Sequence, residues 1–186
     1  GADAAFTIEE LPEKLPEYLE NVDRFYYAFG RDSELDRRVN AALDAVRAKV
    51  RLGVRPPSQL IDPSVILNDM RLRKTPEELD IMRQAAAITR EAHAEAMRFV
   101  RPGMHEYEVE AAIEYFFRRH GAAGPGYGTI VGSGVNATIL HYVENDAQCR
   151  DGELLLIDAE AEYRGYCADI TRTFPVNGTF SPAQRE

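Results

Sequence analysis

The clearest pattern in this chain is a helical spacing of apolar residues. Residues 35–46 repeat apolar side chains every three or four positions, and the repeated residues are Leu35, Val39, Ala42, Leu43 and Val46. Residues 109–117 do the same with Val109, Ala112, Ile113, Phe116 and Phe117, and Gly121 follows as a suitable C-terminal cap. Each segment therefore predicts an amphipathic helix with one buried face.

A third helix has the most specific start signal. In "KTPEELDIM", Thr75 can act as the N-cap, Pro76 suits the first helical position and Glu78 completes a capping box. We predict a helix that begins at Pro76 and is stopped by the Arg-Pro-Gly of residues 101–103. Its buried stripe is expected to consist of Leu79, Met82, Ala86, Ala96 and Phe99. His93 and His120 are interpreted as ordinary helix residues.

Strand patterns flank these helices. "DRFYYAF" predicts a strand over residues 24–29, and from Gly124 onward glycines separate short apolar runs that are typical of strands. Between the two regions, "GVRPPSQLIDPS" breaks the helical pattern near a domain boundary, and Asp62 before Pro63 marks a helix start. Helices followed by antiparallel strands predict an α+β arrangement, with the helices on one face of a sheet.

Composition narrows the class of protein. With 186 residues, the chain can hold one domain, or a small domain joined to part of another. A formal net charge of −9 and the absence of a Lys/Arg cluster argue against nucleic-acid binding. No apolar run is long enough to span a membrane. Cys149 and Cys167 lack the spacing of a disulfide framework, which favours unpaired thiols and a reducing, cytoplasmic location.

The stretch "LLLIDAEAEYRGYCADITRTFP" places two aspartates in a predicted hairpin. If the chain turns between Tyr163 and Arg164, Asp158 falls directly opposite Asp169, on the same face of the pair. Two carboxylates at that distance require a shared proton or a cation between them. The alternative is that one aspartate accepts turn N–H groups and the other pairs with an arginine, and spacing alone leaves both open.

Three longer segments carry a family resemblance. "RLRKTPEELDIMRQAAAITREAHAEAMRFVRPGMHEYEVEA", "IVGSGVNATILHYVEN" and "RDGELLLIDAEAEYRGYCADITRTFPVNG" resemble the Xaa-Pro aminopeptidases (aminopeptidase P), in the metallopeptidase superfamily that includes prolidase. The resemblance implies that residues 1–70 are the C-terminal part of an α/β N-terminal domain. It also implies that residues 71–186 are the first half of a pita-bread catalytic domain.

The resemblance also implies a site. That family holds two divalent metal ions, usually Mn, on two Asp, one His and two Glu, and a hydroxide between the metals attacks the peptide. By the matching motif, Asp158 would be a bidentate ligand of one metal and Asp169 would bridge both. His141 would contact the substrate near the scissile bond as the catalytic histidine, and Tyr127 would contribute to substrate binding.

Two positions depart from the family pattern. Glu160 stands where the family commonly has a small residue, and we expect its charge to face solvent. In the loop before "IVGSG", the chain reads Pro125-Gly126-Tyr127, where the family often has Pro-Ser-Tyr. The first departure adds a carboxylate near the predicted metal ligands, and the second concerns a loop that would contact substrate.

The expected function is removal of an N-terminal residue that precedes proline, by a homo-oligomeric enzyme. The resemblance places the remaining ligands, one His and two Glu, well downstream of "TRTFPVNG", and no His follows His141, so we expect these 186 residues to be an internal fragment that is inactive alone. Prolidase, which cleaves Xaa-Pro dipeptides with the same ligands, is the nearest alternative, although "TRTFPVNG" favours the aminopeptidase. A non-catalytic binding module with the same fold is the alternative from another class.

Overall fold

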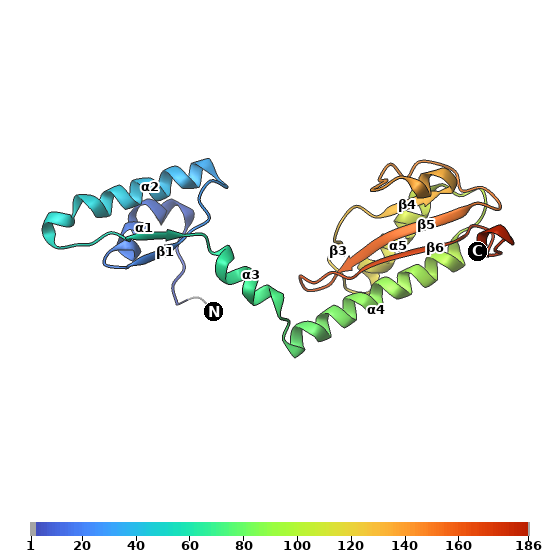
Figure 1. Cartoon of the computed structure of the whole chain (residues 1–186), viewed down its shortest axis with the longest axis horizontal. Helices are drawn as coiled ribbons and strands as arrows, with labels where there is room; N and C mark the ends of the chain where they lie inside the picture. The colour runs from blue at the N-terminus through green and yellow to red at the C-terminus, as the bar shows by residue number, and fades with distance from the viewer. Residues whose placement is uncertain (1–2, 186) are drawn as a thin grey trace. The chain divides into compact units, whose positions relative to one another are not determined.

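The computed structural model describes residues 3–185, which form two compact units divided between Arg73 and Lys74 (Figure 1). The sequence had placed the boundary after residue 70. None of the helices among the described residues combines the length and the apolar character needed to cross a membrane.

The first unit packs two helices beside a small parallel sheet. Its elements are η1 (Ile8–Glu10), α1 (Leu11–Leu19), β1 (Arg24–Tyr26), α2 (Ser33–Ala48), η2 (Val50–Leu52), β2 (Gln59–Ile61) and α3 (Ser64–Leu72). The predicted amphipathic helix is α2, and its residues Val39, Ala42, Leu43 and Val46 form a core with Leu19. The strand predicted over residues 24–29 is shorter than expected, because pairing with β2 covers only three positions.

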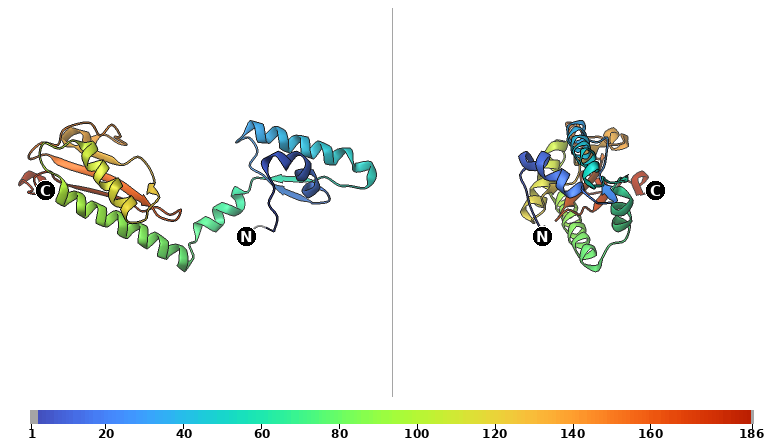
Figure 2. Two further views of the ribbon diagram at one scale, coloured as in Figure 1. Left: turned by 180° about the vertical axis from the view of Figure 1, so that it is seen from behind. Right: turned by 90° about the vertical axis from the view of Figure 1, so that its left-hand side faces the viewer.

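The second unit consists of two helices and an antiparallel sheet. Its elements are α4 (Pro76–Phe99), α5 (Glu106–Arg119), β3 (Gly124–Pro125), β4 (Ile130–Ser133), η3 (Gly134–Thr138), β5 (Leu154–Glu162), β6 (Asp169–Pro175) and η4 (Ala183–Arg185). Strand β5 is central: β3 and β4 pair with it at different positions, and β6 pairs with it as a hairpin. Helices α4 and α5 cover one face of this sheet (Figures 1 and 2). The predicted α+β class is confirmed.

Helix α4 begins at Pro76, as predicted, with both hydrogen bonds of the Thr75 capping box present. Its predicted buried stripe is partly wrong, because Leu79 and Phe99 are 38% and 46% exposed. The buried side chains are instead small or polar: Ala85, Thr89, Ala92, His93 and Ala96. Small residues let the helix approach the strands closely, and the Thr89 hydroxyl accepts a hydrogen bond from the Ala161 backbone N–H at 3.0 Å.

Helix α5 buries Val109, Ile113 and Phe117, which belong to its predicted face, and ends before Gly121 at a φ of 85°. The core of the unit lies between these helices and β5. Along β5, the side chains at Leu155, Ile157, Ala159 and Ala161 are buried against the helices. The intervening side chains, among them Asp158 and Glu160, are half-buried on the other face. That open face carries the candidate site.

Candidate metal and substrate site

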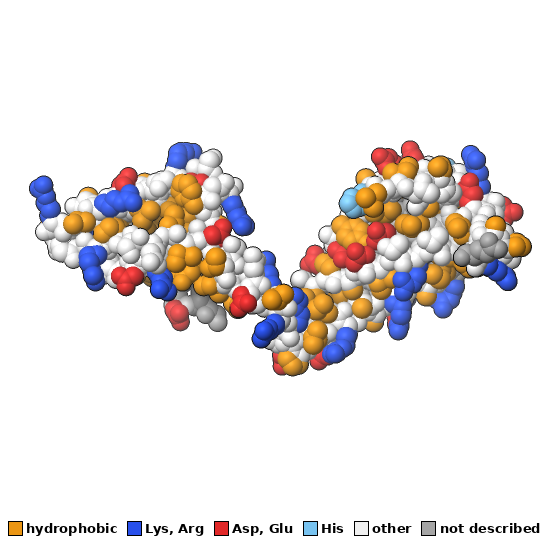
Figure 3. All heavy atoms as spheres, in the orientation of Figure 1, with side chains coloured by type: hydrophobic (Ala, Val, Ile, Leu, Met, Phe, Trp, Pro, Cys, Tyr) orange, Lys and Arg blue, Asp and Glu red, His pale blue; other side chains and the backbone are white. Residues whose placement is uncertain are grey.

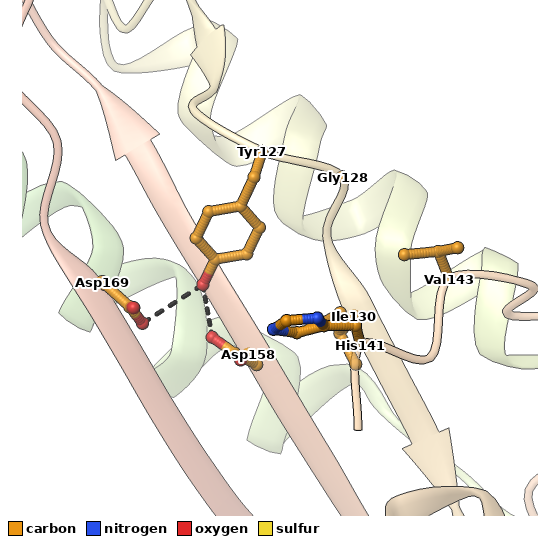
Figure 4. A pocket seen from close by; sticks show the side chains of 7 residues that line it. All are labelled: Tyr127, Gly128, Ile130, His141, Val143, Asp158 and Asp169. Carbon is orange, nitrogen blue, oxygen red and sulfur yellow. Dashed lines mark hydrogen bonds between the residues drawn. The ribbon is translucent and has the colours of Figure 1, made fainter. Parts of the chain in front are cut away.

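The candidate site is a pocket of about 460 Å³ on the open face of β5. Figure 4 shows its lining residues, which come from β5, β6, β4 and the two loops around β4: Tyr127, Gly128, Ile130, His141, Val143, Asp158 and Asp169. Acidic side chains and a histidine gather with apolar side chains on this face in the space-filling view (Figure 3). The four residues that the sequence assigned to the site therefore line one pocket.

The hairpin between β5 and β6 brings the two aspartates together, but in a different register from the predicted one. Asp158 is opposite Thr171, and Glu160 is opposite Asp169. The turn is centred between Arg164 and Gly165, one residue later than predicted, because both residues adopt positive φ (52° and 82°) as a two-residue type I′ turn requires.

The two aspartates still share a face, because the register error is two residues and side chains alternate with a period of two. Tyr163 and Tyr166 exchange both backbone hydrogen bonds, at 2.8 and 3.1 Å. Hydrogen-bonded and non-hydrogen-bonded pairs alternate along an antiparallel ladder, so Glu160 and Asp169 form a non-hydrogen-bonded pair, in which side chains lie closest. Asp158 and Asp169 are therefore diagonal neighbours, with the Glu160 side chain directly across from Asp169.

The Tyr127 hydroxyl lies between the two aspartates (Figure 4). It donates a hydrogen bond to Oδ1 of Asp158 and lies 3.1 Å from Oδ1 of Asp169. Burial raises the pKa of the Tyr127 phenol well above its usual value, and the hydrogen bond to Asp158 adds to this effect. The Asp158 and Asp169 carboxylates therefore converge on the Tyr127 hydroxyl, which is a neutral hydrogen-bond donor.

The alternative in which arginines neutralise the aspartates is not observed. Arg172 donates to the backbone oxygen of Thr171, and the Arg164 guanidinium lies over the ring of Tyr163. Within residues 3–185, no ion pair includes Asp158 or Asp169.

The expectation that Glu160 faces solvent is wrong. Its side chain is half-buried on the same face as the aspartates, beside the Cys167 thiol and the backbone of Gly126. A Cβ at position 126 would collide with the Glu160 carboxylate and lie 2.7 Å from the Cys167 sulfur. Burial raises the pKa of the Glu160 carboxyl, and the Asp169 and Asp158 charges add to this, while a hydrogen bond with Cys167 opposes it. The glycine at 126 makes room for this glutamate.

His141 comes from the loop after η3, and its imidazole lies beside Asp158 in the pocket (Figure 4). The side chain is exposed, and the backbone has a φ of 55°, which non-glycine residues seldom adopt. Val143, two residues later, lines the same pocket. The sequence quoted in the resemblance contains Val143 and Ile130, but neither had been assigned to the site, because apolar residues carry no chemical signal of their own.

The carboxylate oxygens of the pocket are of the type that hard divalent cations prefer, but the described residues supply too few of them for a complete coordination shell. Two carboxylates on neighbouring strands converge on one point, and oxygen ligands of this kind are preferred by Mg, Mn and Ca. No group of three or more His, Cys, Asp or Glu side chains among residues 3–185 is arranged to hold a metal. Of the described residues, Asp158 and Asp169 are thus the two side chains placed so that they could hold a cation together, with Tyr127 beside them. Both cysteines are unpaired, as predicted.

The chain is similar to known proteins over its whole length. Residues 80–186 match the model of metallopeptidase family M24. The whole chain is 48% identical to the Xaa-Pro aminopeptidase of Escherichia coli, and it covers 42% of that protein's length. Over 131 residues, 68% of this chain and 26% of the relative, it is 37% identical to the human Xaa-Pro dipeptidase.

The fold agrees with these sequence matches. The chain superposes on zinc-substituted Escherichia coli aminopeptidase P, solved in complex with product, with a TM-score of 0.95 and 48% identity. All of this chain and 42% of the solved chain are covered. This likeness bears out the predicted pita-bread class, and the chain spans about two-fifths of the length of its relatives.

Proposed function

The chain belongs to metallopeptidase family M24, and from this membership we propose that the full-length protein is a metal-dependent aminopeptidase that releases an N-terminal residue preceding proline. The observation that carries the proposal is the meeting of three groups in one pocket: the Asp158 carboxylate, the Asp169 carboxylate and the His141 imidazole. The 48% identity to a protein named Xaa-Pro aminopeptidase supports the choice of substrate.

In this proposal the Asp158 and Asp169 carboxylates would supply oxygen ligands to the two divalent metal ions. Mn is the expected metal, and the zinc-substituted relative supports a site that accepts more than one divalent ion. When bound, such metals polarise the scissile carbonyl and lower the pKa of a water molecule. The Tyr127 hydroxyl, which donates a hydrogen bond to Asp158 and lies 3.1 Å from Asp169, would remain beside the two ligands as a hydrogen-bond donor.

The protein's own side chains would orient the peptide. We assign His141 to the substrate near the scissile bond, where an imidazole N–H can donate to oxygen that becomes negative in the transition state. Tyr127 forms the wall beside the aspartates, and Ile130 and Val143 give the pocket an apolar side. An apolar wall suits the ring of proline and excludes water from the reacting bond.

The test uses the full-length protein loaded with Mn²⁺, and measures the release of the first residue from Xaa-Pro-Xaa peptides. We expect cleavage that a chelator abolishes and added metal restores, and no cleavage when alanine replaces proline at the second position. His141→Ala should lower kcat and kcat/KM together by about 10²- to 10⁴-fold, with unchanged metal content. Loss of metal in that variant would instead make His141 a ligand.

A dipeptidase of the prolidase type is the second candidate, supported by the 37% identity to human Xaa-Pro dipeptidase over 131 residues. Cleavage of Xaa-Pro dipeptides in preference to longer peptides would favour it. Failure to bind metal or to cleave either substrate would favour the binding module. Cytoplasmic location and homo-oligomerisation stay predictions, which fractionation and sedimentation would check.

A further inference from the structure

The loop that carries His141 is held at both ends and at its centre by one buried side chain. This loop, residues 134–147, leaves β4 through η3 and returns toward β5. Two of its non-glycine residues, His141 and Asn145, have left-handed backbone angles, with φ of 55° and 49°. A histidine in that region is strained by about 1–2 kcal/mol, and such strain persists only where the surroundings enforce it. Something must therefore hold the backbone beside His141.

The side chain that does so is Glu106, the first residue of α5, which is fully buried. Its Oε1 accepts hydrogen bonds from the Ser133 backbone N–H at 2.7 Å and from the Asn136 side-chain amide at 3.2 Å. Its Oε2 accepts from the Tyr142 hydroxyl at 2.7 Å and from the Ala147 backbone N–H at 3.0 Å. Ser133 precedes the loop, Ala147 ends it, and Tyr142 directly follows His141.

These four partners are neutral donors, and among the described residues Glu106 forms no ion pair. The position at the start of α5 adds the favourable interaction of a carboxylate with a helix N-terminus. A buried carboxylate that loses one donor keeps its desolvation penalty, so each of the four bonds is held firmly. Asn136 also donates to the Tyr142 hydroxyl at 3.0 Å, which ties η3 to the same point.

A second anchor fixes the other left-handed residue. The buried Asn145 side chain accepts from the Val131 N–H at 2.9 Å and donates to the Thr129 oxygen at 2.8 Å. Asparagine tolerates positive φ better than most residues, so this anchor matches the backbone angle. Tyr142 is the anchor adjacent to His141, and its hydroxyl donates to Glu106 at 2.7 Å. The loop is thus fixed on either side of the strained histidine.

We propose that Glu106 and Tyr142 are positioning residues for the reaction: their hydrogen bond holds His141 in its left-handed conformation, with the imidazole beside Asp158. The inference rests on the proposed function only in assigning His141 to catalysis. Tyr142 lies outside the set of residues that line the pocket and is buried, so it acts through the backbone of its neighbour.

The decisive experiment is a double-mutant cycle in the full-length, Mn-loaded protein. Tyr142→Phe removes the hydroxyl and keeps the ring. We expect kcat to fall about 10- to 100-fold with little change in KM or metal content, since a shift of about 1 Å in a catalytic group has an effect of that size. In a His141→Ala background, the same substitution should have no further effect. An equal loss in both backgrounds would overturn the proposal.

A matched control is available in the first unit. Tyr27 donates to Asp36 at 2.7 Å, and burial together with that hydrogen bond raises its pKa to about 12. Burial and the bond to Glu106 likewise raise the pKa of Tyr142 to about 12. Tyr27→Phe therefore removes the same kind of hydroxyl-to-carboxylate hydrogen bond within the other unit, and it should leave kcat unchanged. A fall in kcat equal to that of Tyr142→Phe would overturn the proposal.

A physical readout separates this inference from the proposed function. Tyr142→Phe and Glu106→Gln should each speed hydrogen exchange in residues 134–147 and shift the His141 imidazole signal in NMR spectra. If the native protein cleaves no Xaa-Pro peptide but these changes occur, the assigned function fails while the positioning stands. If Tyr142→Phe does not fold, Glu106→Gln carries the cycle with His141→Ala. Unchanged exchange and an unchanged His141 signal would overturn the inference.

Discussion

Replacement of Gly132 by alanine tests how closely the His141 loop packs on the sheet. Gly132 is buried in β4, and a Cβ built on it would lie 2.9 Å from both the backbone carbon and oxygen of Asn136 and 3.0 Å from the Ala137 nitrogen. Contacts this short with backbone atoms cannot be relieved by a rotamer change, so η3 must move. Overpacking of this kind costs about 1–3 kcal/mol of folding free energy.

The control for this substitution is Gly128→Ala. Its Cβ would meet only Val143, at 3.9 Å, and its backbone lies outside the left-handed region. Both substitutions lower the conformational entropy of the unfolded chain, which stabilises the folded state by a similar amount, about 0.4–1 kcal/mol. This contribution therefore cancels in the comparison. The difference in unfolding free energy between the two variants should therefore be about 1–3 kcal/mol, with Gly132→Ala the less stable.

Because the chain contains two compact units, the stability of the second unit needs a local probe. Urea titration followed by hydrogen exchange in peptides from β4 and α5 reports on that unit alone. Gly132→Ala should lower the midpoint and also speed exchange in residues 134–147, where η3 is displaced. If the two variants agree within about 0.5 kcal/mol, the size of ordinary surface effects, the close approach of η3 to β4 is refuted.

Three other predictions concern single groups. Asp169→Asn in the full-length protein should weaken Mn²⁺ binding at least about tenfold by calorimetry, as the loss of a negative ligand requires, and unchanged binding would contradict the metal role. The pKa of the Glu78 carboxyl is lowered from its usual value of 4.5, mainly by a hydrogen bond from the Tyr166 hydroxyl. The stability that this carboxylate contributes is therefore complete above pH 4.5 and is lost as the pH falls through the lowered pKa. Tyr166→Phe should raise the Glu78 pKa in an NMR titration and reduce this loss in acid, whereas an unmoved pKa would rule out the hydrogen bond. Cys149 is fully buried with a pKa raised by burial, so mass spectrometry should find it unmodified by a thiol reagent while the chain is folded, and labelling at the rate of the unfolded chain would contradict its burial.

Features that depend on neighbouring residues were predictable from the sequence. The start of α4 followed from Thr75, Pro76 and Glu78, because a capping box is formed within one turn of helix. The end of α5 at Gly121 is equally local. The buried face of α4 was not predictable from neighbouring residues. The helix approaches the strands closely at Thr89, which favours small residues on the buried face, while Leu79 remains partly exposed.

The site was predictable in its members but not in its geometry. The period of two along a strand placed Asp158 and Asp169 on one face, but the register depended on Arg164 adopting a positive φ that its residue type does not suggest. Glu160 was misplaced because a charge in a strand usually faces water, and here Gly126 leaves space for it beside the site. Glu106 gave no signal because its partners lie 27 to 41 positions away in the sequence.

The tight two-residue turn at Arg164 and Gly165 also limits which insertions and deletions this hairpin can accept. One residue added between the turn and Asp169, with pairing otherwise kept, would move that carboxylate to the helix-covered face of the sheet. Two added residues would return it to the open face, opposite Asp158 instead of Glu160. Length variation that preserves the site should therefore occur in even steps on this strand, or be absorbed by a bulge.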